Sequence, residues 1–534
     1  MDTKGKENDE ILFHEIHKFG RRSILFIAVL GVIGLLFLFA WGIQLRKGLG
    51  VLGLNVPVYW GVYLASFVYF IGLSKGGTLM SAILRITHAE WRRPVTRLSE
   101  AITVFILLFG IASLGLDLGR PDRGPINIFK FGRGQSPLFW DFTSITTYFL
   151  LSAIFLYVAL IPDIGHLRDR TKRGKRFYAI LALNFRGTKK QWRQYERTMF
   201  ILSVLIIPVV VSVHTIVSLV FALTTQPMWH ETMFGPYFVA GAIFSGSAAI
   251  IVMMYLIRRF YHLEDYLTPE VFNNMRKILL AMTMIWVYFF FLENSITWYG
   301  NEISQMVVLR ERALGRYQTL WLLMILTNAV IPFILLTLRR TIVGTSVAAT
   351  SVLFGMYIER YLIVVPTMLN PRLPLVEPRS YGLPMYSPTW VEYISIIGAF
   401  AIFGILYFLF TKFFPIIPVS EVRKEDKIAL ETETNGGTEE FYSSSGGRSD
   451  TIRKMQYGLI AGILLAELGA IIFLLNAIRN GLIFGIFNKE ILDMGSLTFA
   501  VVANFLFLPV HFMIIYTMVK LGRVLIPEGD VMTR

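Results

Sequence analysis

The run VYFIGLSKGGTLMSAI at residues 68–83 carries the pattern that decides the fold. It is apolar apart from Lys75 and a few small hydroxyl side chains, and it belongs to a longer apolar stretch over residues 55–86. A helix of that length can cross the roughly 30 Å of hydrocarbon in a bilayer. A charged residue in the middle of such a helix is costly in lipid, so Lys75 needs a partner, a cavity or a function.

Similar stretches recur along the 534 residues, of which 54% are hydrophobic and 16% charged, and this composition excludes a water-soluble globule. We therefore predict an all-α, polytopic membrane protein with about 12 transmembrane helices. The predicted spans cover residues 23–44, 55–86, 96–118, 138–162, 197–224, 234–260, 273–299, 317–338, 344–366, 390–415, 455–478 and 494–519.

Lysine and arginine residues predict the orientation, because positively charged connections stay in the cytoplasm. With the N-terminus inside, the inner segments carry roughly three times as many of these residues as the outer connections. We therefore predict that both termini are cytoplasmic. The net charge of +15 then reflects topology, with anionic membrane lipids as the counter-charge. No nucleic-acid partner is expected.

One change in composition divides the chain. A stretch rich in Ser, Gly, Thr and Glu, including ETETNGGTEEFYSSSGG, cannot bury a core and predicts a flexible linker. The run YFVAGAIFSGSAAIIV at 237–252 is weakly similar to residues 68–83, which suggests two parallel four-helix repeats. Glycine-rich packing faces, however, also recur by chance in membrane helices. The predicted segments are a cytoplasmic leader at 1–22, a membrane core at 23–418, a cytoplasmic linker at 419–452 and a C-terminal helix pair at 453–534.

Ionisable side chains gather towards the outer face of the predicted spans. No comparable cluster is expected in the inner half, and Lys75 lies near mid-depth. Glu359 and Arg360 are consecutive and diverge by about 100° on a helix, so we expect their partners on other helices, with Arg360 paired to Asp141 or Glu293. The outer set comprises Asp117, Arg120, Asp141, His214, Glu293, Glu359 and Arg360.

Simpler interpretations exist for some of these residues. Asp117 and Arg120 stand in DLGRPDRGP, which is typical of an interfacial turn. His214 fits a hydrogen-bonded packing residue, and a haem held by His214 and His511 is the least favoured interpretation. Glu231 lies in a short external loop, where solvation is the simpler interpretation. Glu293 and Glu359 are the hardest to explain without a function.

The chain has no cysteine, which excludes disulfides, thiolate zinc sites, iron–sulfur clusters and attached c-type haem. We expect no metal site. A protonatable cluster near the outer face then suits a quinone site, where protons are received or released, or a proton-coupled secondary transporter. A purely structural anchor is the weakest alternative, and composition does not separate the first two.

Seven motifs of the chain belong together: LGRP at 118–121, SPLFWDF at 136–142, LIPDIGHLRDR at 160–170, SVHTIVSLVFAL at 212–223, PYFVAGAIFSG at 236–246, ENSITWYG at 293–300 and YIERYLIVVP at 357–366. They resemble the NrfD/PsrC family of quinone-reactive membrane subunits of respiratory complexes. Within this family, YSPTWVEYISIIGAF at 386–400 and the run from PYFVAGAIFSG to HLEDYLT are most similar to the ActC and ActF subunits of alternative complex III.

This resemblance implies two four-helix bundles with flanking helices, and a quinol pocket near the outer face. It also implies a bound quinone, which we expect to be of the menaquinone type, and no haem or iron–sulfur cluster in this chain. The implied partners are an iron–sulfur, ferredoxin-like subunit on the outer face and other integral membrane subunits, including a second NrfD-like chain. The implied location is a prokaryotic cytoplasmic membrane, with oxidoreductase activity only in the assembled complex.

The resemblance also points to individual residues. Asp141 after Trp140 matches an aspartate that the family places at the quinone, and the Glu359–Arg360 pair is kept. Asp117 and Lys75, however, stand where the ActC pattern has histidines. A carboxylate can replace an imidazole as proton acceptor, but its usual pKa is about 3.9 rather than about 6.5. A working quinone site and an ActF-like paralogue that only conducts protons or supports the complex both remain open.

For a working site we expect Asp141 to accept protons and Asp117 to relay them outwards. Lys75 and Arg360 are expected to hold negative charge in place, and the quinone pocket is expected to include Trp140, Arg120 and Glu359. His214 and Glu293 are assigned to a proton path.

Overall fold

A computed structural model describes residues 18–131, 136–171, 174–372, 386–420 and 508–525, together with Ile16 and parts of 454–472. The regular secondary structure of these ranges is helical. Ten of the described helices are long and apolar enough to cross a membrane, which confirms a polytopic all-α membrane protein. The predicted last two spans are described in part, and they include the shorter apolar helices Gln456–Leu465 and Pro509–Leu521. The total of twelve and the side of the termini therefore stay predictions.

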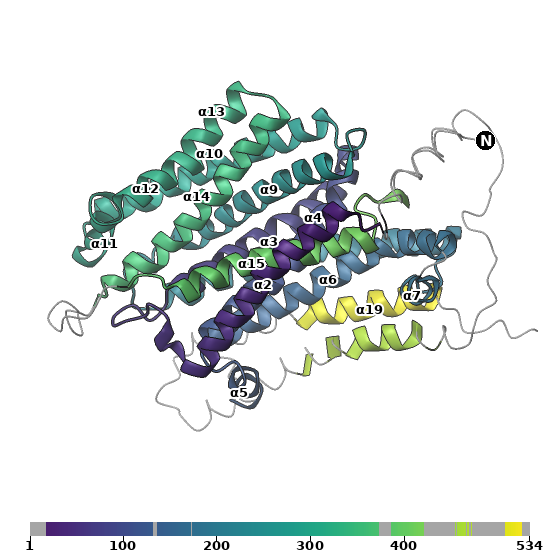
Figure 1. Ribbon diagram of the computed structural model, residues 1–534, viewed down its shortest axis with the longest axis horizontal. Helices are drawn as coiled ribbons and strands as arrows, with labels where there is room; N and C mark the ends of the chain where they lie inside the picture. The colour runs from purple at the N-terminus through teal and green to yellow at the C-terminus, as the bar shows by residue number, and fades with distance from the viewer. Residues whose placement is uncertain are drawn as a thin grey trace, which may run out of the picture.

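The long helices run side by side in one bundle (Figure 1). Short helices α5 (Arg123–Phe131), α7 (Lys175–Leu181) and α11 (Ile303–Ala313) lie between them in the chain. The span over 318–338 is interrupted by a π-helical turn, η3. The membrane helices are α2 (Arg21–Lys47), α3 (Val62–Ile86), α4 (Arg93–Asp117), α6 (Pro137–Arg170), α8 (Lys189–Ala222), α9 (Phe234–Tyr261), α10 (Pro269–Gly300), α12 (Gln318–Ile325) with η3 (Leu326–Val330) and α13 (Ile331–Leu338), α14 (Ile342–Leu369) and α15 (Trp390–Phe413).

Two closed four-helix units form the core, as the family resemblance implied. In the first, α3, α4, α6 and α8 each pack against two neighbours in a ring; in the second, α9, α10, α13 and α14 do the same. Helices α3 and α8 of the first unit contact α9 of the second, and α3 also contacts α14. Helices α2 and α15 pack against each other on the outside. The internal sequence repeat itself stays a prediction.

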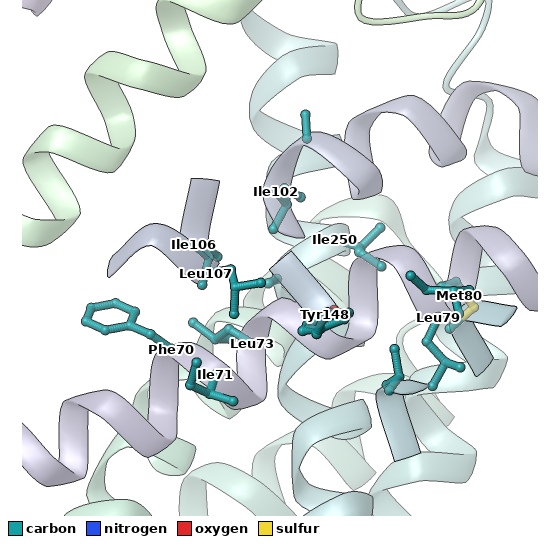
Figure 2. Packing of buried hydrophobic residues seen from close by; sticks show 14 of the residues in the cluster. Phe70, Ile71, Leu73, Leu79, Met80, Ile102, Ile106, Leu107, Tyr148 and Ile250 are labelled. Atoms are coloured by element: carbon teal, nitrogen blue, oxygen red, sulfur yellow. The ribbon is translucent and has the colours of Figure 1, made fainter. Parts of the chain in front are cut away.

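Helix α3 occupies the middle of the bundle and is buried along nearly its whole length. Its glycines allow this position: a Cβ at Gly76 would lie 2.3 Å from the Cα of Gly246 on α9. A Cβ at Gly77 would lie 2.1 Å from the carbonyl oxygen of Ser99 on α4. Apolar side chains of α3 and α4 close around Tyr148 of α6 (Figure 2). Lys75 therefore faces protein and not lipid.

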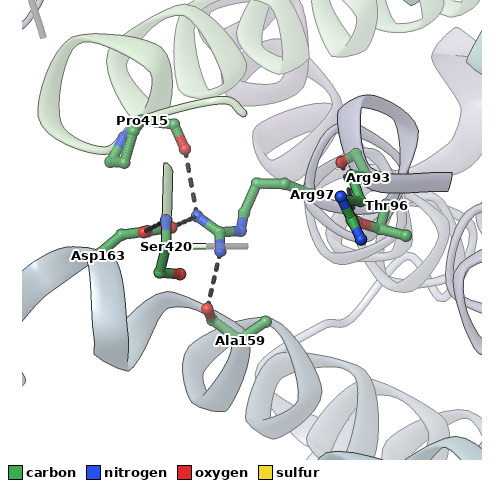
Figure 3. Close-up of polar contacts among 7 residues, drawn as sticks. All are labelled: Arg93, Thr96, Arg97, Ala159, Asp163, Pro415 and Ser420. Atoms are coloured by element: carbon green, nitrogen blue, oxygen red, sulfur yellow. Dashed lines mark hydrogen bonds and ion pairs between the residues drawn. The ribbon is translucent and has the colours of Figure 1, made fainter. Parts of the chain in front are cut away.

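The predicted inner half contains a buried ion pair that no sequence pattern predicts. Arg97 on α4 lies 2.7 Å from Asp163 on α6, and both side chains are almost fully buried. Arg97 also donates to the carbonyl oxygens of Ala159 and Pro415, while the other oxygen of Asp163 accepts the backbone N–H of Ser420 (Figure 3). The expectation that no charged cluster lies in the inner half is wrong, because the pair joins two helices whose charged ends looked like parts of connections.

The described parts of the C-terminal helices lie against the first unit. Helix α19 (Leu508–Leu525) packs against α8, and the carbonyl of its last residue, Leu525, accepts from the side-chain amide of Asn184. Gln456 donates to the carbonyl of Ala179 at 2.6 Å. Both contacts fall on the most basic connection of the chain, so residues 456 and 525 lie at the same end of the bundle.

Candidate functional site

Four buried ionisable side chains meet between the two units: Lys75 of α3, Asp141 of α6, His214 of α8 and Arg360 of α14. We call them the central polar group. All are at least nine-tenths buried. Asp141 is close enough to Lys75 for a direct electrostatic interaction, and His214 interacts electrostatically with both Lys75 and Arg360. All four are predicted site residues, and the structure brings them together.

Aromatic rings position the two cations of this group. The Lys75 ammonium lies 4.6 Å from the ring centroid of Tyr148, within the range of a cation–π contact. The Tyr148 hydroxyl is fixed in turn by the carbonyl of Ser74 at 2.8 Å and the hydroxyl of Thr78 at 3.0 Å. On the other side, the Arg360 guanidinium lies 4.7 Å from the ring centroid of Phe238. Both cations are therefore held without using their terminal N–H donors.

Hydrogen-bond donors and acceptors remain open within the central polar group. The Lys75 ammonium, one Asp141 oxygen and both terminal nitrogens of Arg360 are buried without a hydrogen-bond partner. The two His214 ring nitrogens also have no partner of ordinary hydrogen-bond geometry. Buried polar groups are nearly always paired, and leaving one unpaired costs about 1–3 kcal/mol. Open groups on four helices at one place indicate a ligand site.

Glu359 fixes the orientation of Arg360. One of its carboxylate oxygens accepts from the Trp286 indole at 3.0 Å and from the Tyr237 hydroxyl, and the other lies 3.7 Å from the Arg360 guanidinium. Partners on other helices are thus confirmed for Glu359. The ion pair that Arg360 forms is with its chain neighbour Glu359, which the sequence pattern does not predict, whereas Glu293 interacts with Arg360 electrostatically.

A second set of buried charges extends from Glu359 towards the outer connections. Glu293 on α10 interacts electrostatically with Glu359 and with Arg312 on α11. Arg312 donates to the hydroxyl of Thr367 at 3.1 Å and interacts with Glu231. We call Glu293, Arg312 and Glu231 the outer charge set.

Glu231 is more enclosed than its loop position suggested. The hydroxyl of Thr297 donates to its carboxylate at 2.7 Å, and burial raises the pKa of Glu231 above the usual value. Arg312 and Glu231 are not among the predicted site residues, because both lie in polar connections, where charged residues are usually solvated. The buried Val308 one turn before Arg312 is a local sign that this face of α11 points inwards.

Two predicted site residues lie elsewhere. Arg120 is 62% exposed and is paired with Asp122 through two hydrogen bonds of 2.8 and 2.9 Å, which lower the pKa of Asp122 to about 2. Asp117 lies at the end of α4, where its electrostatic neighbours are Glu392 and Tyr63. The short turn after α4 explains both positions. Neither residue joins the central polar group, so the predicted relay from Asp141 to Asp117 is not supported.

Trp140 directly precedes Asp141 on α6, and its side chain is buried in the apolar core. Among the described residues, no three His, Cys, Asp or Glu side chains lie close enough together to hold a metal ion. The chemistry that the described groups offer is therefore the exchange of protons and the binding of a polar group within an apolar surrounding.

Comparison with known proteins then identifies the family. The model of the polysulphide reductase NrfD family matches residues 50–371, which include the whole central polar group. The chain belongs to the NrfD family. This NrfD-family chain carries, beyond the matched range, the flanking helix α15 and the C-terminal helices.

Three curated relatives of this NrfD-family chain are membrane or reductase subunits. A selenate reductase subunit of Mesobacillus selenatarsenatis is 24% identical over 75% of this chain and 94% of its own length. The Hdr-like menaquinol oxidoreductase integral membrane subunit of Archaeoglobus fulgidus is 23% identical over 68% and 86%. A putative dimethyl sulfoxide reductase membrane subunit of Halobacterium salinarum is 28% identical over 45% and 52%. The finer likeness to ActC and ActF stays a prediction.

Proposed function

We propose that this chain is the quinone-reactive membrane subunit of a multi-subunit oxidoreductase in a prokaryotic cytoplasmic membrane. The observation that supports this function most strongly is the central polar group, whose ammonium, guanidinium, imidazole and carboxyl groups are buried together with open hydrogen-bonding positions. The names of the relatives, among them a menaquinol oxidoreductase subunit, agree with this function.

The residues present fit a quinone head group. Its two carbonyl oxygens accept hydrogen bonds, and the Lys75 ammonium and Arg360 guanidinium have donors to offer. The hydroxyl groups of a quinol need acceptors, which Asp141 supplies through its open oxygen. When bound, a quinol supplies two electrons and two protons. A menaquinone-type ligand is our choice because one relative is named for menaquinol.

The protein groups divide the proton and charge handling between them. Asp141 takes up a proton at its open carboxyl oxygen, and the nearby Lys75 stabilises the ionised carboxylate electrostatically. Arg360, oriented by Glu359, stabilises negative charge on the other side. His214 interacts electrostatically with both cations and exchanges protons with the site, since imidazole can serve as donor and acceptor.

Protons leave or enter through the outer charge set. From Glu359, the buried interactions continue through Glu293 and Arg312 to Glu231, whose loop precedes α9. This direction leads to the face that carries few basic residues, which the positive-inside rule assigns to the exterior. Proton translocation across the whole membrane would need a further path from the central polar group to the inner face.

Electrons need a partner, because a chain without cysteine has no thiolates to hold an iron–sulfur cluster. We propose a ferredoxin-like iron–sulfur subunit on the outer face, together with other integral subunits, including a second NrfD-like chain. The three relatives are themselves named as subunits. A likeness to alternative complex III belongs to the same proposal.

Reconstitution tests this function against its main alternative. The complex is purified through a tag on this chain, and oxidation of a short-chain menaquinol analogue is followed together with reduction of the co-purified subunits. We expect oxidation by the complex and none by this chain alone. Proton or solute flux in liposomes that contain only this chain, with no quinol oxidation by the complex, would instead establish a transporter.

A further inference from the structure

A buried contact joins the C-terminal helices to the first four-helix unit. Nδ1 of His511, on α19, lies 2.5 Å from a carboxyl oxygen of Glu467, and its Nε2 lies 3.0 Å from the hydroxyl oxygen of Thr147 on α6. All three side chains are at most 1% exposed. The described helices thus bring together a carboxyl group, an imidazole and a hydroxyl group, with the imidazole in contact with both of the others.

Hydrogen-bond directions determine where the protons lie. The Thr147 hydroxyl has one hydrogen, and it donates to the carbonyl of Thr143 at 2.8 Å. Thr147 can then only accept from His511, so Nε2 carries a hydrogen. If the imidazole is neutral, Nδ1 has a lone pair and accepts from a protonated Glu467; otherwise an imidazolium faces a carboxylate. In both cases the acid and the ring share one proton and have no net charge.

The other oxygen of Glu467 decides between these two states. It is buried and has no hydrogen-bond partner. An ionised carboxylate would leave part of its charge on that oxygen without compensation, which is costly at membrane depth. A protonated acid instead leaves a carbonyl oxygen there, which carries no formal charge. The geometry therefore favours a neutral acid that donates to a neutral imidazole.

We propose that Glu467, His511 and Thr147 form an uncharged clamp that fixes the C-terminal helix pair to α6 and so positions Asp141. Thr147 binds the C-terminal pair, while the next residue, Tyr148, binds the backbone of α3 and contacts Lys75. Helix α6 is thereby held from both sides, nearly two turns from Asp141. The positioning of Asp141 rests on the proposed quinone site, whereas the clamp itself does not.

Cleavage of the linker tests the clamp without any activity measurement. A protease site is inserted within residues 421–453 of the full chain, and the C-terminal fragment that stays bound to the tagged core after cleavage in detergent is measured. Loss of a buried hydrogen bond corresponds to roughly a five- to hundredfold weaker association. We expect that loss for His511→Leu and for the nearly isosteric Thr147→Val, and wild-type retention for Glu467→Gln, whose amide N–H can still donate to Nδ1.

Thr517→Val is the matched control. Thr517 is also buried on α19, but its hydroxyl bonds only to carbonyls of its own helix, so retention should not change. Should Thr147→Val retain the fragment like wild type, the clamp is refuted, even if His511→Leu fails to fold.

Infrared difference spectra of wild type against Glu467→Gln test the proton assignment. We expect loss of the carbonyl stretch of a protonated carboxylic acid. Loss of a carboxylate stretch would refute the neutral clamp.

Quinol kinetics test the positioning role. In the complex, Thr147→Val should raise the KM for the menaquinol analogue several-fold. Glu467→Gln, which keeps the hydrogen bond to His511, should have the wild-type KM. An unchanged KM would refute the positioning of Asp141. If the wild-type complex oxidised no quinol, the proposed function would be refuted. The cleavage experiment would still test the clamp, because it does not depend on quinol oxidation.

Discussion

Replacing Asp141 with Asn is expected to lower the quinol-dependent turnover of the assembled complex by about 10²–10⁴-fold, the usual contribution of a positioned acid or base. Asn keeps the size and the hydrogen-bonding capacity of the side chain but accepts no proton. Because Asp141 is buried beside Lys75, bulk water has little access to replace it. The measurement is the steady-state rate of menaquinol-analogue oxidation by a complex in which every subunit has been verified.

Two variants control for charge and for folding. Asp122→Asn removes a carboxylate that is exposed and paired with Arg120, and it should leave turnover unchanged. Asp141→Glu retains the carboxyl and should recover part of the rate. Wild-type turnover of Asp141→Asn in an intact complex would show that the proton acceptor lies elsewhere.

Breaking the inner ion pair from one side is expected to cost about 3–5 kcal/mol of folding stability. Arg97→Met leaves Asp163 as a buried carboxylate, and Asp163→Leu leaves Arg97 as a buried guanidinium with only carbonyl acceptors. The double variant Arg97→Met with Asp163→Leu removes both charges of the pair. It should recover most of the loss, although Ser420 still lacks its acceptor.

Thermal unfolding of the detergent-purified chain, followed by size-exclusion chromatography with fluorescence detection, measures these effects. Both single variants should unfold well below the wild type, and the double variant should lie closer to it. Equal losses that simply add in the double variant would mean that the two side chains act independently, which their 2.7 Å contact argues against.

The sequence predicts helices better than it predicts contacts between them. Apolar length alone located the ten described spans, because a helix that crosses the bilayer must be long and apolar. The partner of a buried charge cannot be predicted in the same way. Arg97 and Asp163 lie 66 positions apart, and no local pattern connects them.

The site shows the same division. Lys75, Asp141, His214 and Arg360 were predictable because each is a costly group inside an apolar run. Arg120 was misplaced because a motif drew attention to it, while the turn pairs it with Asp122. Glu467 received no role, since its partner His511 lies 44 positions further on. Arg312 was missed because α11 is polar, and only the folded chain turns that face inwards.

Photoaffinity labelling tests whether the central polar group binds a quinone. The purified complex is irradiated with a photoreactive menaquinone analogue, with and without excess unlabelled menaquinone, and the labelled peptides are identified by mass spectrometry. We predict labelling on α3, α6, α8 or α14 next to Lys75, Asp141, His214 or Arg360, suppressed by the competitor. Competed labelling confined to other segments, or to other subunits only, would place the quinone site away from the central polar group.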